Sequence, residues 1–183
     1  MRRIFVSVLL ALAAAAALWA QAPAAFAEKP ALLTSIGQSA DIEMVKVLLN
    51  RGKVAHTADP LVTAAKLPAG AKTLVLAVGG SSKGLGAAGI STEAEMDRAK
   101  ALFKRARELG MKIIAIHVGG EARRGTLSDA FISLCVPVSD YTIVVEDADK
   151  DGLFTKLAGQ AKIPLVKVDK ITAAGAPLAA AFK

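Results

Sequence analysis

The sequence contains few residues that could crosslink the chain or bind a soft metal. Its 183 residues include one cysteine, one tryptophan, one tyrosine and two histidines. A single cysteine cannot form an internal disulfide, which excludes a disulfide-stabilised small secreted fold. No His/Cys cluster has the spacing of a zinc site. Cys135 lies in the apolar stretch 131–136, which predicts a buried small hydrophobic residue and not a reactive thiol.

The overall composition is that of a globular protein with a core. Hydrophobic residues make up 54% and charged residues 21% of the chain, which excludes disordered and collagen-like chains. The formal net charge is +7. The basic residues are scattered and have no aromatic residues between them, so no nucleic-acid partner is expected.

The first 27 residues have the pattern of a secretory signal peptide. Arg2 and Arg3 precede the uncharged apolar run 4–20, and Ala25-Phe26-Ala27 is a small-x-small motif. We therefore expect residues 1–27 to be cleaved after Ala27, leaving 28–183 as a single exported α/β domain, periplasmic or extracellular. The alternative is an uncleaved membrane anchor. No later apolar run approaches spanning length, so no stable membrane anchor is expected after cleavage.

Beyond the signal segment, apolar strands alternate with amphipathic helices. Runs of apolar residues predict strands over 31–36, 54–57, 73–78, 112–118, 141–145 and 165–168. Five helices are expected between and after these strands. The first follows a cap at Ser39, and the second runs from Thr92 to Leu109, with Glu95 completing a capping box. The third runs from a cap at Thr126 or Ser128 to Cys135, and the last two cover 151–159 and 171–182. The pattern predicts a single doubly wound parallel sheet, flavodoxin-like or Rossmann-like, with five to six strands and helices on both faces. The alternation leaves no surplus apolar face that would indicate a protein-interaction module.

In such sheets, ligands bind beyond the carboxyl ends of the strands. That rule selects the segments Gly37-Gln38-Ser39, 79–90, 117–124, 146–151 and 169–170. The segment 79–90 is rich in glycine and leads to a helix, so its backbone N–H groups are expected to bind an anion. The ligand-binding residues expected there are Gly79, Gly80, Ser81, Ser82, Lys83, Gly84 and Gly86. The alternative is a flexible connector.

Two nucleotide-binding motifs are incomplete in this segment. A Walker A loop requires Lys and Ser or Thr after its last glycine, but Leu85 and Gly86 follow Gly84. The glycines at 80, 84 and 86 resemble the cofactor glycines of short-chain dehydrogenases. The catalytic Tyr-x-x-x-Lys of that family is absent, because Val145 stands where the lysine belongs after Tyr141. No cofactor is therefore expected.

The segment after the 112–118 strand contains the candidate acid–base residues. His117 is a candidate general base, with Glu121 or Asp151 as its partner, or a half-buried histidine bonded to the backbone. Four neighbouring residues are expected to bind an anionic ligand: Gly119, Gly120, Arg123 and Arg124. The alternative for the arginines is a surface ion pair with Glu121.

A metal site is not expected. Asp147, Asp149, Asp151 and Gly152 match the start of a calcium loop, but Ala158 occupies the position of the bidentate glutamate. Asp149 or Asp151 is expected instead to cap a helix that begins near Leu153.

Four stretches together resemble a known family. They are 33–41, 78–90, 117–125 and 150–156. The chain is similar in them to an uncharacterised bacterial family of exported proteins, domain of unknown function 6305. That resemblance implies one exported domain and transfers no catalytic residue. Two functions remain open: a binding module for a small anionic ligand, and a transferase or hydrolase acting on such a ligand with His117 as base.

Overall fold

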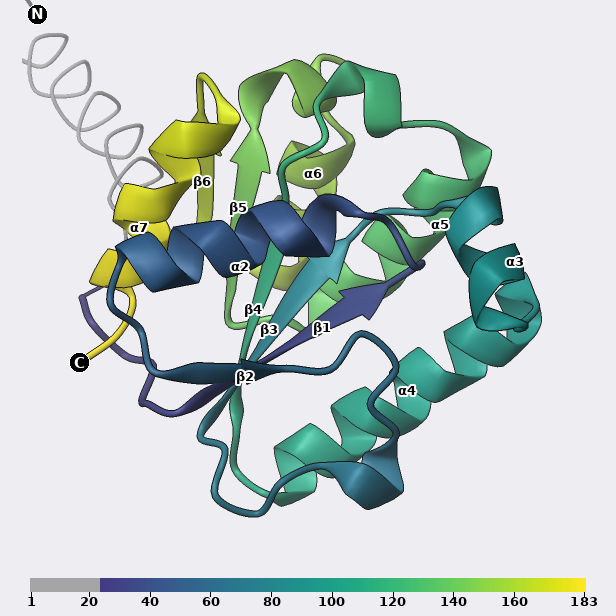
Figure 1. Cartoon of the computed structure of the whole chain (residues 1–183). Coiled ribbons are helices and arrows are strands. Elements are labelled where there is room, and N and C mark those ends of the chain that lie inside the picture. The colour runs from purple at the N-terminus through teal and green to yellow at the C-terminus, as the bar shows by residue number, and fades with distance from the viewer. Residues whose placement is uncertain (1–23) are drawn as a thin grey trace, which may run out of the picture.

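The computed structural model describes residues 24–183 and contains one six-stranded parallel sheet (Figure 1). The strand order is β2-β1-β3-β4-β5-β6, with every neighbouring pair parallel. The strands are β1 (Ala31–Ile36), β2 (His56–Ala58), β3 (Thr73–Val78), β4 (Lys112–His117), β5 (Tyr141–Val145) and β6 (Leu165–Val168). The doubly wound sheet expected from the sequence is confirmed.

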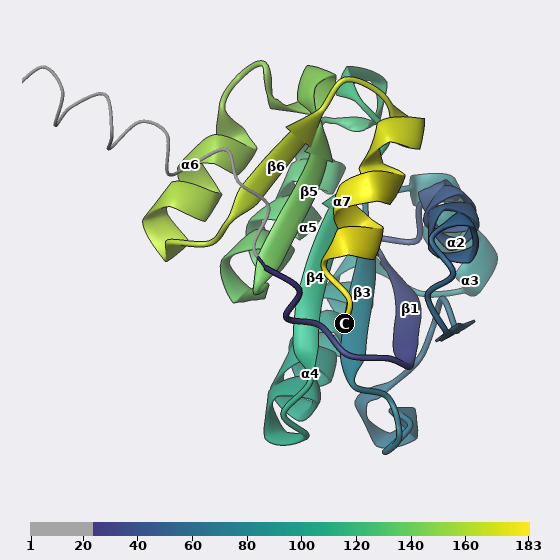
Figure 2. The same ribbon diagram turned by 90° about the vertical axis from the view of Figure 1, so that its left-hand side faces the viewer.

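Helices cover both faces of the sheet (Figures 1 and 2). They are α2 (Asp41–Arg51), α3 (Ser82–Ala88), α4 (Thr92–Glu108), α5 (Thr126–Cys135), α6 (Leu153–Ala161) and α7 (Gly175–Ala180). The core on one face contains apolar residues of α2 and α7, and the core on the other face contains those of α4, α5 and α6. Because both faces are covered, the central strands β1, β3 and β5 are buried along their whole length, which explains their continuous apolar sequences.

The sheet has its switch point between β1 and β3. The chain moves outward from β1 to β2 in one direction, and from β3 through β4 and β5 to β6 in the other. After β1 the chain enters α2 on one face, and after β3 it enters α3 and α4, with α4 on the opposite face. The connections therefore diverge here, which is the arrangement that opens a crevice at the carboxyl edge of such a sheet.

Several expected element ends differ in the structure. The segment 79–90 is not an open loop, because it contains α3. The expected capping roles of Thr92 and Glu95 are wrong: Ser91 caps α4, and Glu95 is fully buried instead. Gly125, not Thr126 or Ser128, precedes α5. The last expected helix is divided into a 3₁₀ turn, Ile171–Ala174, and α7.

The start of α2 also differs from the expectation. The N-cap is Ala40 and not Ser39, although the Ser39 hydroxyl still accepts a hydrogen bond from the Asp41 N–H at 3.2 Å. Residues 1–23 of the expected signal peptide lie outside the described part of the chain. Among residues 24–183, none of the helices combines the length and apolar character needed to cross a bilayer.

Candidate functional site

The loops after β1, β3 and β4 meet at the switch point. Gln38 and Gly80 form an antiparallel bridge, and the Ser39 N–H donates to the Gly79 carbonyl at 3.2 Å. We call the cluster formed at this point the switch-point site. It consists of Ser39, Asp41, Gly79, His117, Gly119 and Arg123.

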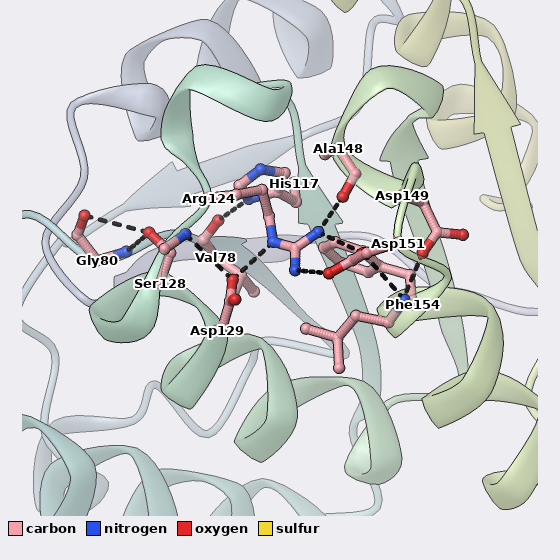
Figure 3. A network of polar contacts seen from close by, with 12 residues as sticks. Val78, Gly80, His117, Arg124, Ser128, Asp129, Ala148, Asp149, Asp151 and Phe154 are labelled. Carbon is pink, nitrogen blue, oxygen red and sulfur yellow. Dashed lines mark hydrogen bonds and ion pairs between the residues drawn. The ribbon is translucent and has the colours of Figure 1, made fainter.

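His117 is held in a defined protonation state. It is 1% exposed at the end of β4, and its Nδ1 lies 2.8 Å from the Val78 carbonyl oxygen (Figure 3). A carbonyl can only accept, so Nδ1 carries the hydrogen and Nε2 of the neutral ring has a free lone pair. Burial lowers the pKa of His117, although the backbone groups of Val78 and Gly120 and the charge of Asp41 oppose this shift. The neutral ring therefore predominates at neutral pH, with Nε2 as an acceptor.

Asp41 contributes a second acceptor to the site. It is the first residue of α2, and its Oδ1 lies 3.9 Å from Nε of the half-exposed Arg123. Within residues 24–183, the buried Oδ2 of Asp41 and the buried Nε2 of His117 both have no hydrogen-bond partner. Buried polar atoms are rarely left without a partner, and each such atom suggests an unseen water or ligand.

Two glycines allow this close packing. A Cβ at Gly119 would lie 2.7 Å from Asp41 Oδ2 and 2.3 Å from Arg123 Cγ. A Cβ at Gly79 would lie 3.2 Å from Ser39 Cβ and 3.8 Å from Asp41 Oδ2. Both glycines were expected to let a ligand approach the backbone. Here they let the Asp41 carboxylate lie against the ends of β3 and β4.

A buried ion pair supports the loop that leads to Asp41. Glu95 Oε1 accepts hydrogen bonds from the Gly37 N–H at 2.9 Å and from Gln38 Nε2 at 3.0 Å. Arg98 donates to both oxygens of Glu95, and also to the carbonyls of Ser35 and Val62. The α4 helix thereby fixes the left-handed residues Gly37 and Gln38, which have φ of 94° and 58°.

The glycine-rich segment does not offer the free backbone donors that were expected. Ser81 caps α3 by accepting the Gly84 N–H at 3.0 Å, and the Gly80 N–H donates to Ser128 Oγ at 3.0 Å. Gly84 packs directly against the Gln38 carbonyl. Ser82, Lys83 and Gly86 are exposed on α3. Of this segment, only Gly79 belongs to the switch-point site.

Arg124 has a structural role. Its side chain is 11% exposed and pairs with Asp129 at 2.6 Å and Asp151 at 2.8 Å. It also donates to the Ala148 carbonyl and lies over the Phe154 ring, 5.7 Å from the ring centre (Figure 3). These contacts tie α5 to the segment before α6, so the guanidinium is not available to a ligand.

Glu121 is paired away from His117. Its carboxylate accepts from Lys150 at 2.6 Å, and Asp151, the other candidate partner, pairs with Arg124. Asp41 is instead the carboxylate whose charge acts on the His117 ring. Gly120 has a φ of 62° and joins Gly119 to the turn that contains Glu121 and Arg123.

The three aspartates of the calcium-like segment have separate partners. The N-cap residue of α6 is Gly152, not Asp149 or Asp151, but Asp149 accepts the N–H groups of Phe154 and Thr155 in the first turn and pairs with Lys167 at 2.8 Å. Asp147 pairs with Lys150. In the described part of the chain, no group of three or more His, Cys, Asp or Glu side chains is arranged to hold a metal.

Asp41 and Glu95 were not predicted from the sequence to be part of this region. The strand-end rule did select Gly37-Gln38-Ser39, and Asp41 follows two residues later. Extending this segment by two residues would have included it. Glu95 looked like an ordinary capping residue, and only the fold shows that it turns inward.

The chain was also compared with known proteins. No curated protein matches it. A GDSL-like lipase from Bacteroides thetaiotaomicron has a similar structure, with 10% identity over 75% of this chain and 66% of the lipase chain, and a TM-score of 0.37. A likeness this distant transfers no activity. The profile of the family described as "Domain of unknown function (DUF6305)" matches residues 28–182, so the chain belongs to this family.

Proposed function

We propose that the protein is a binding module for a small hydroxylated anion, such as a hydroxycarboxylate or a polyol phosphate, at the switch-point site. One observation carries this proposal: Asp41 Oδ2 and His117 Nε2 are buried acceptors without a partner among residues 24–183. Two ligand hydroxyls, or one water, can donate to these two acceptors, whereas a simple anion such as sulfate cannot. The predicted export of the chain remains part of the proposal and places the ligand outside the cytoplasm.

The positive charge for the anionic part of the ligand comes from Arg123. Its side chain is 53% exposed, and its nearest carboxylate oxygen, on Asp41, is 3.9 Å away, which is long for a hydrogen-bonded pair. Arg123 can therefore turn toward a ligand at low cost. Lys83 is exposed on α3, outside the switch-point site, and we propose that it adds a more distant positive charge. Arg124 is left out because three acceptors already satisfy it.

An enzymatic role for His117 is the second candidate. Its neutral ring and free Nε2 lone pair suit a general base, which could take the proton of a ligand hydroxyl. Ser39 carries the hydroxyl of the switch-point site, but this hydroxyl accepts the Asp41 N–H, and no hydrogen bond joins it to His117 among the described residues. Binding therefore fits the geometry better than nucleophilic catalysis does.

The proposal is tested by calorimetry and thermal shift on the mature protein. Glycerol 3-phosphate and gluconate are the hydroxylated probes, and sulfate and acetate are the matched probes without hydroxyl donors. Only the hydroxylated probes should stabilise the protein, by about 2.7 kcal/mol at one hundred times the dissociation constant. A parent protein that responds to no probe, or equally to all four, would contradict the proposal. Turnover of an added ester or phosphate ester that His117→Gln abolishes would favour the enzyme.

Variants then locate the site. Asp41→Asn and His117→Gln should each weaken binding about ten- to a hundred-fold, because hydrogen bonds to a charged or buried group are worth about 1.5–3 kcal/mol. Arg123→Ala and Lys83→Ala should weaken it through lost charge. Lys104→Ala, on the exposed face of α4, is the control and should bind like the parent. Parent-like binding by Asp41→Asn would place the ligand elsewhere.

A further inference from the structure

Residues 26–28 are built into the folded domain, at the edge of the sheet opposite the switch-point site. The N–H groups of Phe26 and Ala27 both donate to the Ala181 carbonyl, at 2.9 and 2.8 Å. The Lys183 N–H donates to the Ala27 carbonyl at 3.0 Å, and Ala27 forms a parallel bridge with Phe182. Figure 2 shows this segment, in dark purple, crossing beside the C-terminus. We call residues 26–28 the N-terminal strap.

Side chains of the strap are also part of the core. Ala27 is 0% exposed and belongs to the cluster on the α2 and α7 face of the sheet. The Phe26 ring packs edge-on against the Tyr141 ring, with centres 6.0 Å apart. The Glu28 N–H donates to Thr73 Oγ1 at 3.1 Å, and the same hydroxyl donates to the Glu28 carbonyl at 2.8 Å. The strap thereby covers the first residues of β3 and β5.

This packing conflicts with the cleavage expected after Ala27. That cut would remove Phe26 and Ala27, leave the Lys183 N–H without its acceptor, and uncover Tyr141. Tyr141 is fully buried, and burial raises its pKa to about 12. Loss of the Phe26 ring would remove its edge-on contact with Tyr141 and expose apolar surface there.

The sequence offers a second processing position that spares the strap. Ala22-Pro23-Ala24 is also a small-x-small motif, three residues before Ala25-Phe26-Ala27. We propose that the signal peptide is removed after Ala24, so that the mature chain begins at Ala25 and retains the strap. In this step, water hydrolyses the Ala24–Ala25 amide, and leaves a carboxylate on Ala24 and an amino group on Ala25. The proposal does not depend on the ligand of the switch-point site.

The intact mass of the exported protein tests this directly. It should correspond to a chain that begins at Ala25. A mass that begins at Glu28, or one that retains Ala24, would overturn the proposal. Two matched variants locate the cut: Ala24→Glu should abolish the cut after Ala24, because the position requires a small side chain, and Ala27→Glu should leave the position of the cut unchanged. Blocked processing in Ala27→Glu with normal processing in Ala24→Glu would equally overturn it.

A stability measurement gives an independent readout. Purified chains that begin at Ala25 and at Glu28 should differ in Tm by roughly 5 °C or more, with the longer chain the more stable. A chain that begins at Ala25 and carries Phe26→Gly controls for the position of the terminal amino group, and should lose part of the difference. Equal Tm values for the Ala25 and Glu28 chains would show that the strap contributes nothing and would overturn the structural basis of the proposal.

Discussion

Replacing Glu95 by glutamine tests how the fold positions the switch-point site. Glu95 is fully buried and accepts four hydrogen bonds, from Gly37, Gln38 and two nitrogens of Arg98, at 2.7–3.0 Å. Three of these bonds go to Oε1 and one goes to Oε2. In Glu95→Gln the amide oxygen can keep the three bonds, but the amide NH₂ then meets the Arg98 Nε–H donor. Arg98, whose side chain is 10% exposed, would be left as a poorly compensated cation.

Breaking a buried ion pair by removing one partner typically costs about 3–5 kcal/mol, of a total stability of roughly 5–15 kcal/mol. Glu95→Gln should therefore lower the free energy of unfolding by about 3 kcal/mol or more and lower the Tm by roughly 6–20 °C. Urea denaturation followed by circular dichroism measures the first quantity, and calorimetry measures the second. Because Glu95 holds Gly37 and Gln38, the variant should also bind the hydroxylated probes more weakly at a temperature at which it is folded.

The control is Glu108→Gln on the same helix. Glu108 pairs with Arg105 at 3.1 Å, and both side chains are 47% exposed. Exposed pairs contribute roughly 0–1 kcal/mol, so this variant should be close to the parent. If Glu95→Gln were as stable as Glu108→Gln, the pair with Arg98 would not support the loop, and the reasoning would be wrong.

Three further results are expected. Burial lowers the pKa of His117 below the 6.5 of an exposed histidine, so below about pH 6.5 the unfolded chain binds a proton that the folded chain does not. The free energy of unfolding should therefore fall as the pH drops below about 6.5, by up to about 1.4 kcal/mol per pH unit. Urea denaturation at pH 7.5 and 5.5 should show a smaller pH dependence in His117→Gln than in the parent, and an equal pH dependence would contradict the prediction. Asp149→Ala removes the carboxylate that accepts two N–H groups of α6 and pairs with Lys167. The variant should lower the free energy of unfolding, measured in urea, by about 3 kcal/mol. A loss below about 1 kcal/mol would mean that water replaces these contacts. Gly119→Ala should lower the free energy of unfolding by about 1–3 kcal/mol, because the added Cβ would meet Asp41 and Arg123. Gly86→Ala on α3 is the control and should be neutral or slightly stabilising, because no described atom lies within 4 Å of the added Cβ. Equal Tm values for the two variants would refute the tight packing at Gly119.

The sheet could be predicted because its strands are buried on both faces. A continuous apolar run such as Thr73–Val78 is consistent with a central parallel strand, and the glycines that follow it mark the turn at the carboxyl edge. Helix α3 was missed for a physical reason. Its sequence contains two glycines in seven residues, and glycine disfavours helix. Packing of Gly84 on the Gln38 carbonyl overrides that preference, and this contact between distant segments is invisible in the local pattern.

The location of the candidate site could be predicted, and of its six residues only Asp41 was not named from the sequence. The strand-end rule brought together the segments after β1, β3 and β4, and His117 and Gly119 lie where it placed them. It could not tell which charged groups are free. Arg124 and Glu121 looked available in the sequence, yet both find partners near residue 150, more than twenty residues away. Asp41 is the first residue of α2, and only its burial next to Gly119 makes it part of the site.

The central claim is that hydroxyl groups of a ligand donate to His117 Nε2 and Asp41 Oδ2, one hydroxyl to each acceptor. The chain has only two histidines, His56 and His117, so the imidazole nitrogen chemical shifts of isotope-labelled protein report on this site with an internal control. At neutral pH, Nε2 of His117 should show the shift of an unprotonated nitrogen and should move on addition of glycerol 3-phosphate, while the nitrogens of His56 stay in place. The response should be lost in Asp41→Asn. A His117 Nε2 signal that does not move when glycerol 3-phosphate is added, or a movement shared equally by His56, would contradict the account.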